Sequence, residues 1–377
     1  MTEQTEKYTA LYEAHKQLGA SFTDFGGWQM PLKYSSELAE HKAVRSAAGL
    51  FDLSHMGEVE VTGPDAGAFL DYALVGKLSA VKPGRAKYSL ITNTDGGIID
   101  DLISYRLADD SYLVVPNAGN ADTVAAELAA RAQGFDVAVN NVSAETALVA
   151  VQGPAAEAIL LTLVPEGQHD AVTGMKYYAA DTVDVTVEER TLNLLVARTG
   201  YTGEDGFEIY VPNTDAADLW DALLAAGADS GLIPAGLACR DSLRLEAGMP
   251  LYGNELTLDT DPYAAGLGPV VALSKDGGFV GRTALEARKE AGPARRLVGL
   301  KGAGRRSARS SYRVLKDGET IGEVTSGAPS PTLGYPIALA YVDSAYTEPG
   351  TLLDVDLRGK PEQFEVVDLP FYKREKR

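Results

Sequence analysis

Two adjacent carboxylates, Asp100 and Asp101, stand in an otherwise apolar stretch, GGIIDDLISYR over 96–106. The glycine pair predicts a tight turn, and the β-branched and apolar residues after it predict a strand. Because side chains alternate across a strand, Asp101 shares a face with two isoleucines and Tyr105, with no cation on that face. Burying an unpaired carboxylate costs roughly several kcal/mol. Asp101 is therefore a candidate for acid–base or charge-stabilising chemistry; the alternative is an Asp bound by backbone amides near the turn.

The other reactive side chains favour few mechanisms. The single cysteine, Cys239, excludes an intramolecular disulfide and a cysteine zinc cluster. The four histidines form neither an HxH nor an HExxH pattern, so no metal site is predicted. The sequence contains no P-loop, no strand-linked GxGxxG and no GxSxG elbow, which argues against nucleotide phosphate binding and an acyl-transfer serine. We expect chemistry based on carboxylates, an arginine or a bound organic cofactor.

The charge balance limits the partners. The chain has 53 acidic against 34 basic residues, a net charge of −19. Such a surface repels phosphate backbones and anionic lipid, so neither nucleic acid nor a membrane is expected as a partner. No run approaches the ~20 apolar residues of a membrane span, and the N-terminal segment is polar. A length of 377 residues predicts two or three domains, and we expect a cytoplasmic protein.

Short strands and helices alternate in the order of an α+β protein. The first series is expected as helices over 4–19 and 35–48, strand composition over 50–63, a helix over 64–74, strands over 86–92, 98–106 and 111–116, and a helix near 120–132. The second series is expected as a strand over 146–152, a helix over 154–163, strands near 183–197 and 206–211, and a helix over 215–228. Gly49 is expected to close the second helix, and Pro64 to open the third.

The two series resemble each other. EVEVTGPDAGAFL is similar to ALVAVQGPAAEAIL, and GGIIDDLISYR is similar to YTGEDGFEIYV. We expect two similar layers that face one another, with the functional elements at their interface. The basic, Gly-rich region 290–310 predicts a linker and an exposed loop. From 311 onward, short strands and Gly, Pro and Ser turns predict a small all-β domain.

At the level of motifs, the chain resembles the T-protein family of the glycine cleavage system, aminomethyltransferases that use tetrahydrofolate. Segments in family order carry the resemblance over nearly the whole chain: DFGGWQMPLKY (24–34), HKAVRSAAGLFDLSHMGE (41–58), GGIIDDLI (96–103), ALVAVQGP (147–154), RTGYTGEDGFEI (198–209), PAGLACRDSLRLEAGMPLYGNE (234–255) and TSGAPSPTLGYPIALAYV (325–342). The resemblance implies an α+β fold with two ferredoxin-like layers and a C-terminal β-barrel around a central folate channel.

The implied domains follow from the same resemblance. A first α+β, folate-binding domain is expected over 1–52 and 143–270. A second α+β domain over 53–142 carries Asp101. A linker with a helix over 271–294 leads to the barrel over 295–377.

The reaction implied by the resemblance starts from an aminomethyl group on the dihydrolipoyl arm of a partner, the H-protein. Ammonia leaves, and the one-carbon unit passes to tetrahydrofolate, giving 5,10-methylenetetrahydrofolate without a metal. Asp101 matches the family acid beside N10 of the folate, where an anion stabilises a developing iminium cation. Both orientation of N10 and proton relay remain open as its role.

Two further charged residues match the family's folate site. Glu208 matches the acid that binds the amino and N–H edge of the pterin, where a carboxylate accepts two parallel bonds. Glu204 is the competing acid, expected to be solvated or to bind a local amide in its turn. Arg240 matches the folate-site arginine; the alternative is a salt bridge to Asp241 or Glu246. Arg244 is expected to form a structural ion pair.

Apolar and amide positions complete the implied channel. Four flat or flexible side chains match its lining: Met56, Tyr88, Tyr105 and Tyr201. Asn117 matches an amide donor to the pterin, with a turn Asn after a proline as the alternative. His55 is interpreted as a satisfied structural histidine and Cys239 as a buried, small apolar residue.

Two other functions are alternatives to the aminomethyltransferase. One is a folate enzyme of the same fold that takes its one-carbon unit from a free methylated amine or sulfonium compound. The other is a non-catalytic folate-binding protein that assists iron–sulfur assembly, which the intact Asp101, GYTGE and CRD segments disfavour. Full-length agreement without a fused oxidase domain favours the aminomethyltransferase.

Two basic clusters are candidates for contact with an acidic H-protein, with a solvated surface as the alternative. The first cluster is Arg295, Arg296, Arg305, Arg306 and Arg309, and the second is Lys373, Arg374, Lys376 and Arg377.

Overall fold

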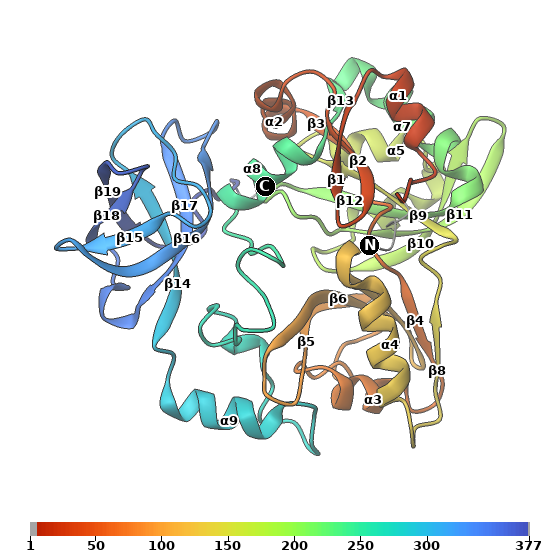
Figure 1. Ribbon diagram of the computed structural model, residues 1–377. Helices are drawn as coiled ribbons and strands as arrows, with labels where there is room; N and C mark the ends of the chain where they lie inside the picture. Colours follow the sequence, from red (N-terminus) through yellow and green to blue (C-terminus); the bar gives the residue numbers. More distant parts are fainter. Residues whose placement is uncertain (1–5, 376–377) are drawn as a thin grey trace. The chain divides into compact units, whose positions relative to one another are not determined.

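The structure is a computed structural model that describes residues 6–375 (Figure 1). The chain divides into two compact units. The first unit comprises the chain up to Leu70 together with Leu78–Tyr88 and Leu102–Arg240. The second unit comprises Asp71–Lys77, Ser89–Asp101 and the chain from Asp241 onward.

A six-stranded sheet forms the core of the first unit, in the spatial order β10-β11-β12-β9-β3-β13. Its strands are β3 (Ala48–Asp52), β9 (Thr146–Gln152), β10 (Ala180–Val187), β11 (Arg190–Ala197), β12 (Gly206–Pro212) and β13 (Leu232–Pro234). Only β13 pairs in parallel, with β3. Three helices accompany the sheet: α5 (Ala156–Leu161), α6 (His169–Thr173) and α7 (Ala216–Gly227), of which α5 and α7 pack on β9. Fully buried Trp220 and Phe207 belong to this core, so apolar burial stabilises the layer that carries β12.

A five-stranded sheet follows the order β5-β6-β7-β4-β8. Its strands are β4 (Val59–Thr62), β5 (Arg85–Thr92), β6 (Ile98–Ala108), β7 (Ser111–Pro116) and β8 (Ala138–Asn141), accompanied by α3 (Ala66–Ala73) and α4 (Ala121–Arg131). The predicted tight turn is present between β5 and β6. The Asn93 side chain accepts bonds from two amides of this turn, and Gly96 has φ +78°, the left-handed region that glycine adopts without strain.

The C-terminal strands close into a six-stranded barrel, shown in blue in Figure 1. Its strands are β14 (Arg295–Gly302), β15 (Arg313–Lys316), β16 (Glu319–Pro329), β17 (Pro336–Asp343), β18 (Leu352–Asp356) and β19 (Pro361–Val367). The barrel closes because β14 pairs with both β17 and β19. Helix α9 (Arg282–Ala291) precedes the barrel and ends four residues before β14.

The predicted fold class, α+β with a C-terminal barrel, is confirmed. The strands of the first sheet all fall within 1–52 and 143–270, those of the second within 53–142, and those of the barrel within 295–377. The domain boundaries themselves stay a prediction.

Several predicted elements were wrong in detail. The helix expected over 4–19 is the short α1 (Tyr12–Gln17), and the hairpin of β1 (Ser21–Phe25) and β2 (Trp28–Lys33) was not predicted. Helix α2 (Glu37–Ser46) ends before Gly49, which lies inside β3 rather than closing the helix. The linker expected over 290–310 contains β14, because its alternating apolar residues pair in the barrel.

Candidate active site

Glu208 lies in the middle of β12, between two neighbouring strands of the six-stranded sheet. Its cross-strand partners are Ala150 on β9 and Ala197 on β11. Paired residues in an antiparallel sheet point to the same face, so Glu208 is flanked by two methyl groups. These small neighbours leave space on both sides of its half-buried carboxylate.

Two hydroxyl groups bind one oxygen of this carboxylate. Thr199 donates a short hydrogen bond to Oε2 of Glu208, and the Tyr105 hydroxyl donates to the same oxygen over 3.3 Å. The two hydroxyls also bond to each other over 2.9 Å. Burial raises the pKa of Glu208 above its ordinary value, and Thr199, Arg240 and Tyr105 oppose the rise. Among the residues that the structure describes, Oε1 receives no hydrogen bond, so this oxygen can accept bonds from a ligand.

Arg240 supplies the positive charge of the site. It lies on α8 (Leu237–Glu246), and its guanidinium carbon is 4.7 Å from the centre of the Tyr201 ring, a cation–π contact. The positive charge of Arg240 opposes the rise in the pKa of Glu208 that burial causes. The same charge adds to the lowering of the His55 pKa, of which burial is the larger cause. The structure therefore brings Glu208, Arg240 and Tyr201 together, as the sequence led us to expect; their roles stay a prediction.

Gln152 at the end of β9 holds the loop that carries Thr199 and Tyr201. Its Nε2 donates to the Thr199 carbonyl over 3.0 Å, and its Oε1 accepts from the Thr202 hydroxyl over 2.9 Å. A Cβ atom at Gly200 would lie 2.0 Å from the Gln152 side chain, and one at Gly206 would lie 2.5 Å away. Sequence reasoning missed the roles of Gln152 and Thr199, although both stand in the quoted family segments, because their hydrogen-bond partners lie on other elements.

A buried glutamate positions the segment that leads into α8. Glu40 on α2 is fully buried and accepts hydrogen bonds from the Tyr34 and Gly236 amides over 2.8 and 3.0 Å. A Cβ atom at Gly236 would lie 2.3 Å from the Leu32 carbonyl oxygen, so only glycine fits this close approach. The contacts fix where α8 begins, and hence where Arg240 lies one turn later.

The turn between β3 and β4 contains His55 and Met56. His55 is buried with its ring edge against Phe25, and its Nδ1 has no hydrogen-bond partner within residues 6–375. The interpretation as a satisfied histidine was therefore wrong for this nitrogen. Burial and the charge of Arg240 lower the pKa of His55 to about 4, and Asp52 opposes the change, so the ring is uncharged at neutral pH. Met56 is half-buried beside it.

The other predicted binding residues lie at separate places in the five-stranded sheet. Tyr88 is half-buried on β5. Asn117 is half-buried at the end of β7, where the short 3₁₀ turn Ala118–Asn120 begins. Tyr105, on β6, is fully buried and donates a hydrogen bond to Glu208. Participation of Tyr88 and Asn117 in ligand binding stays a prediction.

Asp101 belongs to the second unit and lies on β6, half-buried. Its neighbour Asp100 is fully buried, and both residues have interaction partners in the structure. The expectation of an unpaired Asp101 buried on the more apolar face was therefore wrong, because Asp100 is the deeper of the two. Asp101 is partly exposed, whereas Asp100 is not.

Two competing residues have structural partners. Glu204, expected to be solvated or bound to an amide, is buried in an ion pair of 3.0 Å with Arg45. The expectation of a solvated or amide-bound Glu204 was therefore wrong, and the ion pair with Arg45 accounts for its carboxylate without a ligand. Arg244 is almost completely buried and binds Glu255 over 2.9 Å and Asp241 over 2.8 Å, so the predicted structural ion pair is confirmed. Cys239 is buried, as predicted.

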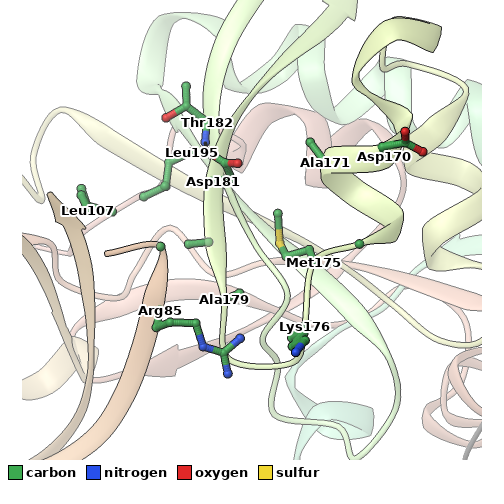
Figure 2. A pocket seen from close by; sticks show the side chains of 13 residues that line it. Arg85, Leu107, Asp170, Ala171, Met175, Lys176, Ala179, Asp181, Thr182 and Leu195 are labelled. Carbon is green, nitrogen blue, oxygen red and sulfur yellow. Dashed lines mark hydrogen bonds between the residues drawn. The ribbon is translucent and has the colours of Figure 1, made fainter. Parts of the chain in front are cut away.

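An open hollow of about 560 Å³ lies elsewhere in the first unit (Figure 2). Arg85 and Lys176 approach it from one side and Asp181 lies on a strand beside it. None of the predicted site residues lines this hollow. The candidate site is therefore defined by the contacts of Glu208 and not by the hollow.

The described residues contain no group of three or more His, Cys, Asp or Glu side chains that could hold a metal ion. Among residues 6–375, no helix has both the length and the apolar character that crossing a membrane requires.

Comparisons with known proteins agree over the full length. The GCVT N-terminal domain model matches residues 11–275, and the glycine cleavage T-protein C-terminal barrel domain model matches residues 295–373. The aminomethyltransferase of Streptomyces avermitilis is 56% identical over 100% of both chains, and that of Bacillus subtilis is 46% identical over 98% of this chain and 99% of its own.

A solved structure gives the same result. The crystal structure of glycine cleavage system aminomethyltransferase T from Bartonella henselae has a TM-score of 0.89 and 40% identity, covering 98% of this chain and 99% of that one. The chain belongs to the glycine cleavage T-protein family. Its function is accordingly that of an aminomethyltransferase of the glycine cleavage system, as the sequence predicted.

Proposed function

We propose that the chain transfers the one-carbon unit of an aminomethyl-dihydrolipoyl H-protein to tetrahydrofolate. The C–N bond to ammonia and the C–S bond to the dihydrolipoyl arm break, and bonds from the carbon to N5 and N10 of the folate form. The hydrogens of N5 and N10 end on the departing ammonia and on the thiol. The products are ammonia, the dihydrolipoyl carrier and 5,10-methylenetetrahydrofolate, and the atoms balance without an oxidant.

One observation carries the folate assignment. The Glu208 carboxylate has Oε2 held by Thr199 and Tyr105, while Oε1 accepts no hydrogen bond from the described residues. A fixed, half-buried anion with one available oxygen suits a neutral ligand edge that donates N–H groups, as the amino and ring N–H of a pterin do. The raised pKa of Glu208 marks it as a group whose charge is destabilised until a donor binds it.

Arg240 and Tyr201 support the same ligand. Their cation–π contact holds a planar cation and an aromatic face together, and each can bind a conjugated ring system or an acceptor atom on it. Met56, Tyr88 and Asn117 are proposed as further contacts to the folate, in the roles that the family resemblance implies.

We assign the catalytic charge to Asp101. Loss of ammonia develops positive charge on the transferred carbon, and a carboxylate near that charge stabilises the transition state. Asp101 is half-buried, so partial desolvation strengthens the electric field of its carboxylate. Orientation of N10 and proton relay both fit this residue. A cytoplasmic location stays a prediction.

The test mixes the protein with aminomethylated H-protein and tetrahydrofolate and follows 5,10-methylenetetrahydrofolate and ammonia together. Equal amounts of both products are expected, and neither with unloaded H-protein. The Glu208→Ala variant should need more folate for the same rate. Turnover of a free methylated amine or sulfonium donor, with none from the loaded carrier, would overturn the proposal in favour of another folate enzyme of this fold.

A further inference from the structure

The start of β6 is held by a segment that comes much later in the chain, residues 251–260. Both backbone polar groups of Ile98, the first residue of β6, bind this segment. The Ile98 amide donates to the Thr260 carbonyl over 3.2 Å, and the Ile98 carbonyl accepts from the Tyr252 hydroxyl over 3.1 Å. Asp101 follows about 10 Å further along the strand. All of these residues belong to the second unit.

Glycines let this part of the chain approach its neighbours closely. A Cβ atom at Gly97 would lie 2.0 Å from the Leu258 carbonyl oxygen, so a side chain there would displace the 251–260 segment. On another side of the same turn, a Cβ atom at Gly96 would lie 3.0 Å from the Leu285 side chain on α9. The start of β6 is therefore enclosed by residues from outside its own sheet.

The 251–260 segment is itself fixed to the barrel. Glu255 is fully buried, and its carboxylate accepts from Arg244 over 2.9 Å. Its carbonyl accepts from the hydroxyl of Tyr341, on β17, over 2.8 Å. The Thr260 hydroxyl closes a local turn by donating to the Thr257 carbonyl over 2.9 Å. A segment with this many internal and external bonds gives the start of β6 a firm support.

The place of Asp101 in β6 makes this support important. The register of β6 with β7 runs from Leu102 to Ala108, and Asp101 lies just before its first pair. A carboxylate stabilises a developing charge only from a fixed position. A displacement of about 1 Å can cost roughly 10²-fold in rate. The bonds that hold Ile98 therefore bear directly on where the Asp101 carboxylate lies.

We propose that Tyr252 is a positioning residue for Asp101. Its hydroxyl holds the Ile98 carbonyl, and this bond keeps the start of β6, and with it the Asp101 carboxylate, in place for the reaction. The effect on catalysis rests on the proposed function, whereas the hold of Tyr252 on β6 does not. Tyr341 supplies a matched control, because its hydroxyl also donates to a backbone carbonyl, that of Glu255, but not to one of β6.

The activity test compares Tyr252→Phe with Tyr341→Phe. Each variant loses one bond from a hydroxyl to a backbone carbonyl, so the two should melt within about 3 °C of each other. Tyr252→Phe should lower the single-turnover rate about tenfold, while the dissociation constant of tetrahydrofolate changes less than about twofold. Tyr341→Phe should change neither. An equal loss of rate in both variants would overturn the proposal, because it would show a general loosening of the segment.

A double variant tests whether Tyr252 acts through Asp101. In the Asp101→Asn background, Tyr252→Phe should lower the rate no further, since the charge that it positions is already gone. A further loss of about tenfold in this background would mean that the tyrosine acts by another route, and the proposal would be wrong.

Hydrogen exchange tests the hold on β6 without any substrate. Tyr252→Phe should speed amide exchange in a peptide that covers 97–103, and Tyr341→Phe should not. Unchanged exchange in Tyr252→Phe would overturn the proposal, because the hydroxyl would then not hold the strand. If the wild type forms no 5,10-methylenetetrahydrofolate from loaded H-protein, the proposed function fails, while exchange still decides whether Tyr252 holds β6.

Discussion

The hydroxyl of Tyr105 lies 3.3 Å from Oε2 of Glu208, although 103 positions separate the two residues in the sequence. The bond joins a strand of the five-stranded sheet to a strand of the six-stranded sheet within the first unit. It gives Glu208 one fixed oxygen, so the orientation of the carboxylate is set before a ligand arrives.

Alanine substitutions at Glu208 and Glu204 should have different effects, the first on folate binding and the second on the stability of the fold. Glu208→Ala should weaken tetrahydrofolate binding by ~1–3 kcal/mol in a calorimetric titration, the scale for a charge-assisted hydrogen bond. Glu204→Ala should leave folate binding nearly unchanged but lower the free energy of unfolding by about 3–5 kcal/mol, because it removes the carboxylate that pairs with the buried Arg45 guanidinium. Equal losses of folate affinity in both variants would contradict the assignment of Glu208.

The adjacent aspartates should respond differently to amide substitution. Asp101→Asn should lower turnover by roughly 10²-fold with folding largely kept, the scale for a positioned charge or proton carrier. Asp100→Asn should mainly lower the melting temperature, because Asp100 is fully buried. Single-turnover rates and thermal melts measure the two effects separately. If Asp100→Asn lowers turnover more than Asp101→Asn does, the assignment of the catalytic role to Asp101 is wrong.

His55 should make the protein sensitive to acid. Its pKa is lowered from 6.5 to about 4 in the folded state, so below the unfolded value the unfolded chain binds the proton first. Stability from this group is complete above about pH 6.5 and falls by about 3 kcal/mol in total as pH drops toward 4. His55→Gln should lose this part of the acid sensitivity, which unfolding curves at several pH values would detect. A ring that titrates near its ordinary pKa by NMR would refute the prediction.

Docking of the acidic carrier should depend on salt and on a basic cluster. Arg305 and Arg306 are exposed, and Arg306 is 3.9 Å from Glu362, a distance at which the pair is weak. Activity with H-protein should fall as salt shortens the Debye length from ~30 to ~8 Å. Reversal of both arginines to Glu should raise the apparent KM for H-protein without changing folate affinity.

The matched control for this reversal is Arg85→Glu with Lys176→Glu, which changes the net charge equally at the hollow of Figure 2. If the control raises the KM and the arginine variant does not, docking lies at the hollow instead. Lys373→Glu with Arg374→Glu tests the second cluster. Lys376 and Arg377 of that cluster lie outside the described residues.

Local patterns predicted the elements whose ends are marked by turn residues. The strands expected over 111–116 and 146–152 have the bounds that the structure shows for β7 and β9. The N-terminal hairpin was not predicted, although Gly26 and Gly27 are a turn signal and form its turn with positive φ. Glycine commonly ends a helix, yet the pairing of β3 with β9 places Gly49 in a strand.

Only the site residues that stand in family motifs could be predicted from the sequence. Glu208, Arg240 and Tyr201 come from separate motifs and meet in the structure. Burial depends on tertiary packing, and for that reason the depth of Asp100 and the ion pair of Glu204 could not be predicted from composition or spacing. The Gln152 amide was equally invisible, because its partners lie about 50 positions away.

That amide also constrains how the enzyme could be evolved or engineered. Side chains at Gly200 and Gly206 would both collide with Gln152. A Cβ atom at Gly206 would also lie 2.5 Å from the Val151 carbonyl oxygen, so the backbone of β9 requires that glycine whatever residue stands at 152. The three atoms nearest a Cβ at Gly200 all belong to the Gln152 side chain, so a smaller residue at 152 should make room for a substitution at Gly200, and the two positions should show epistasis.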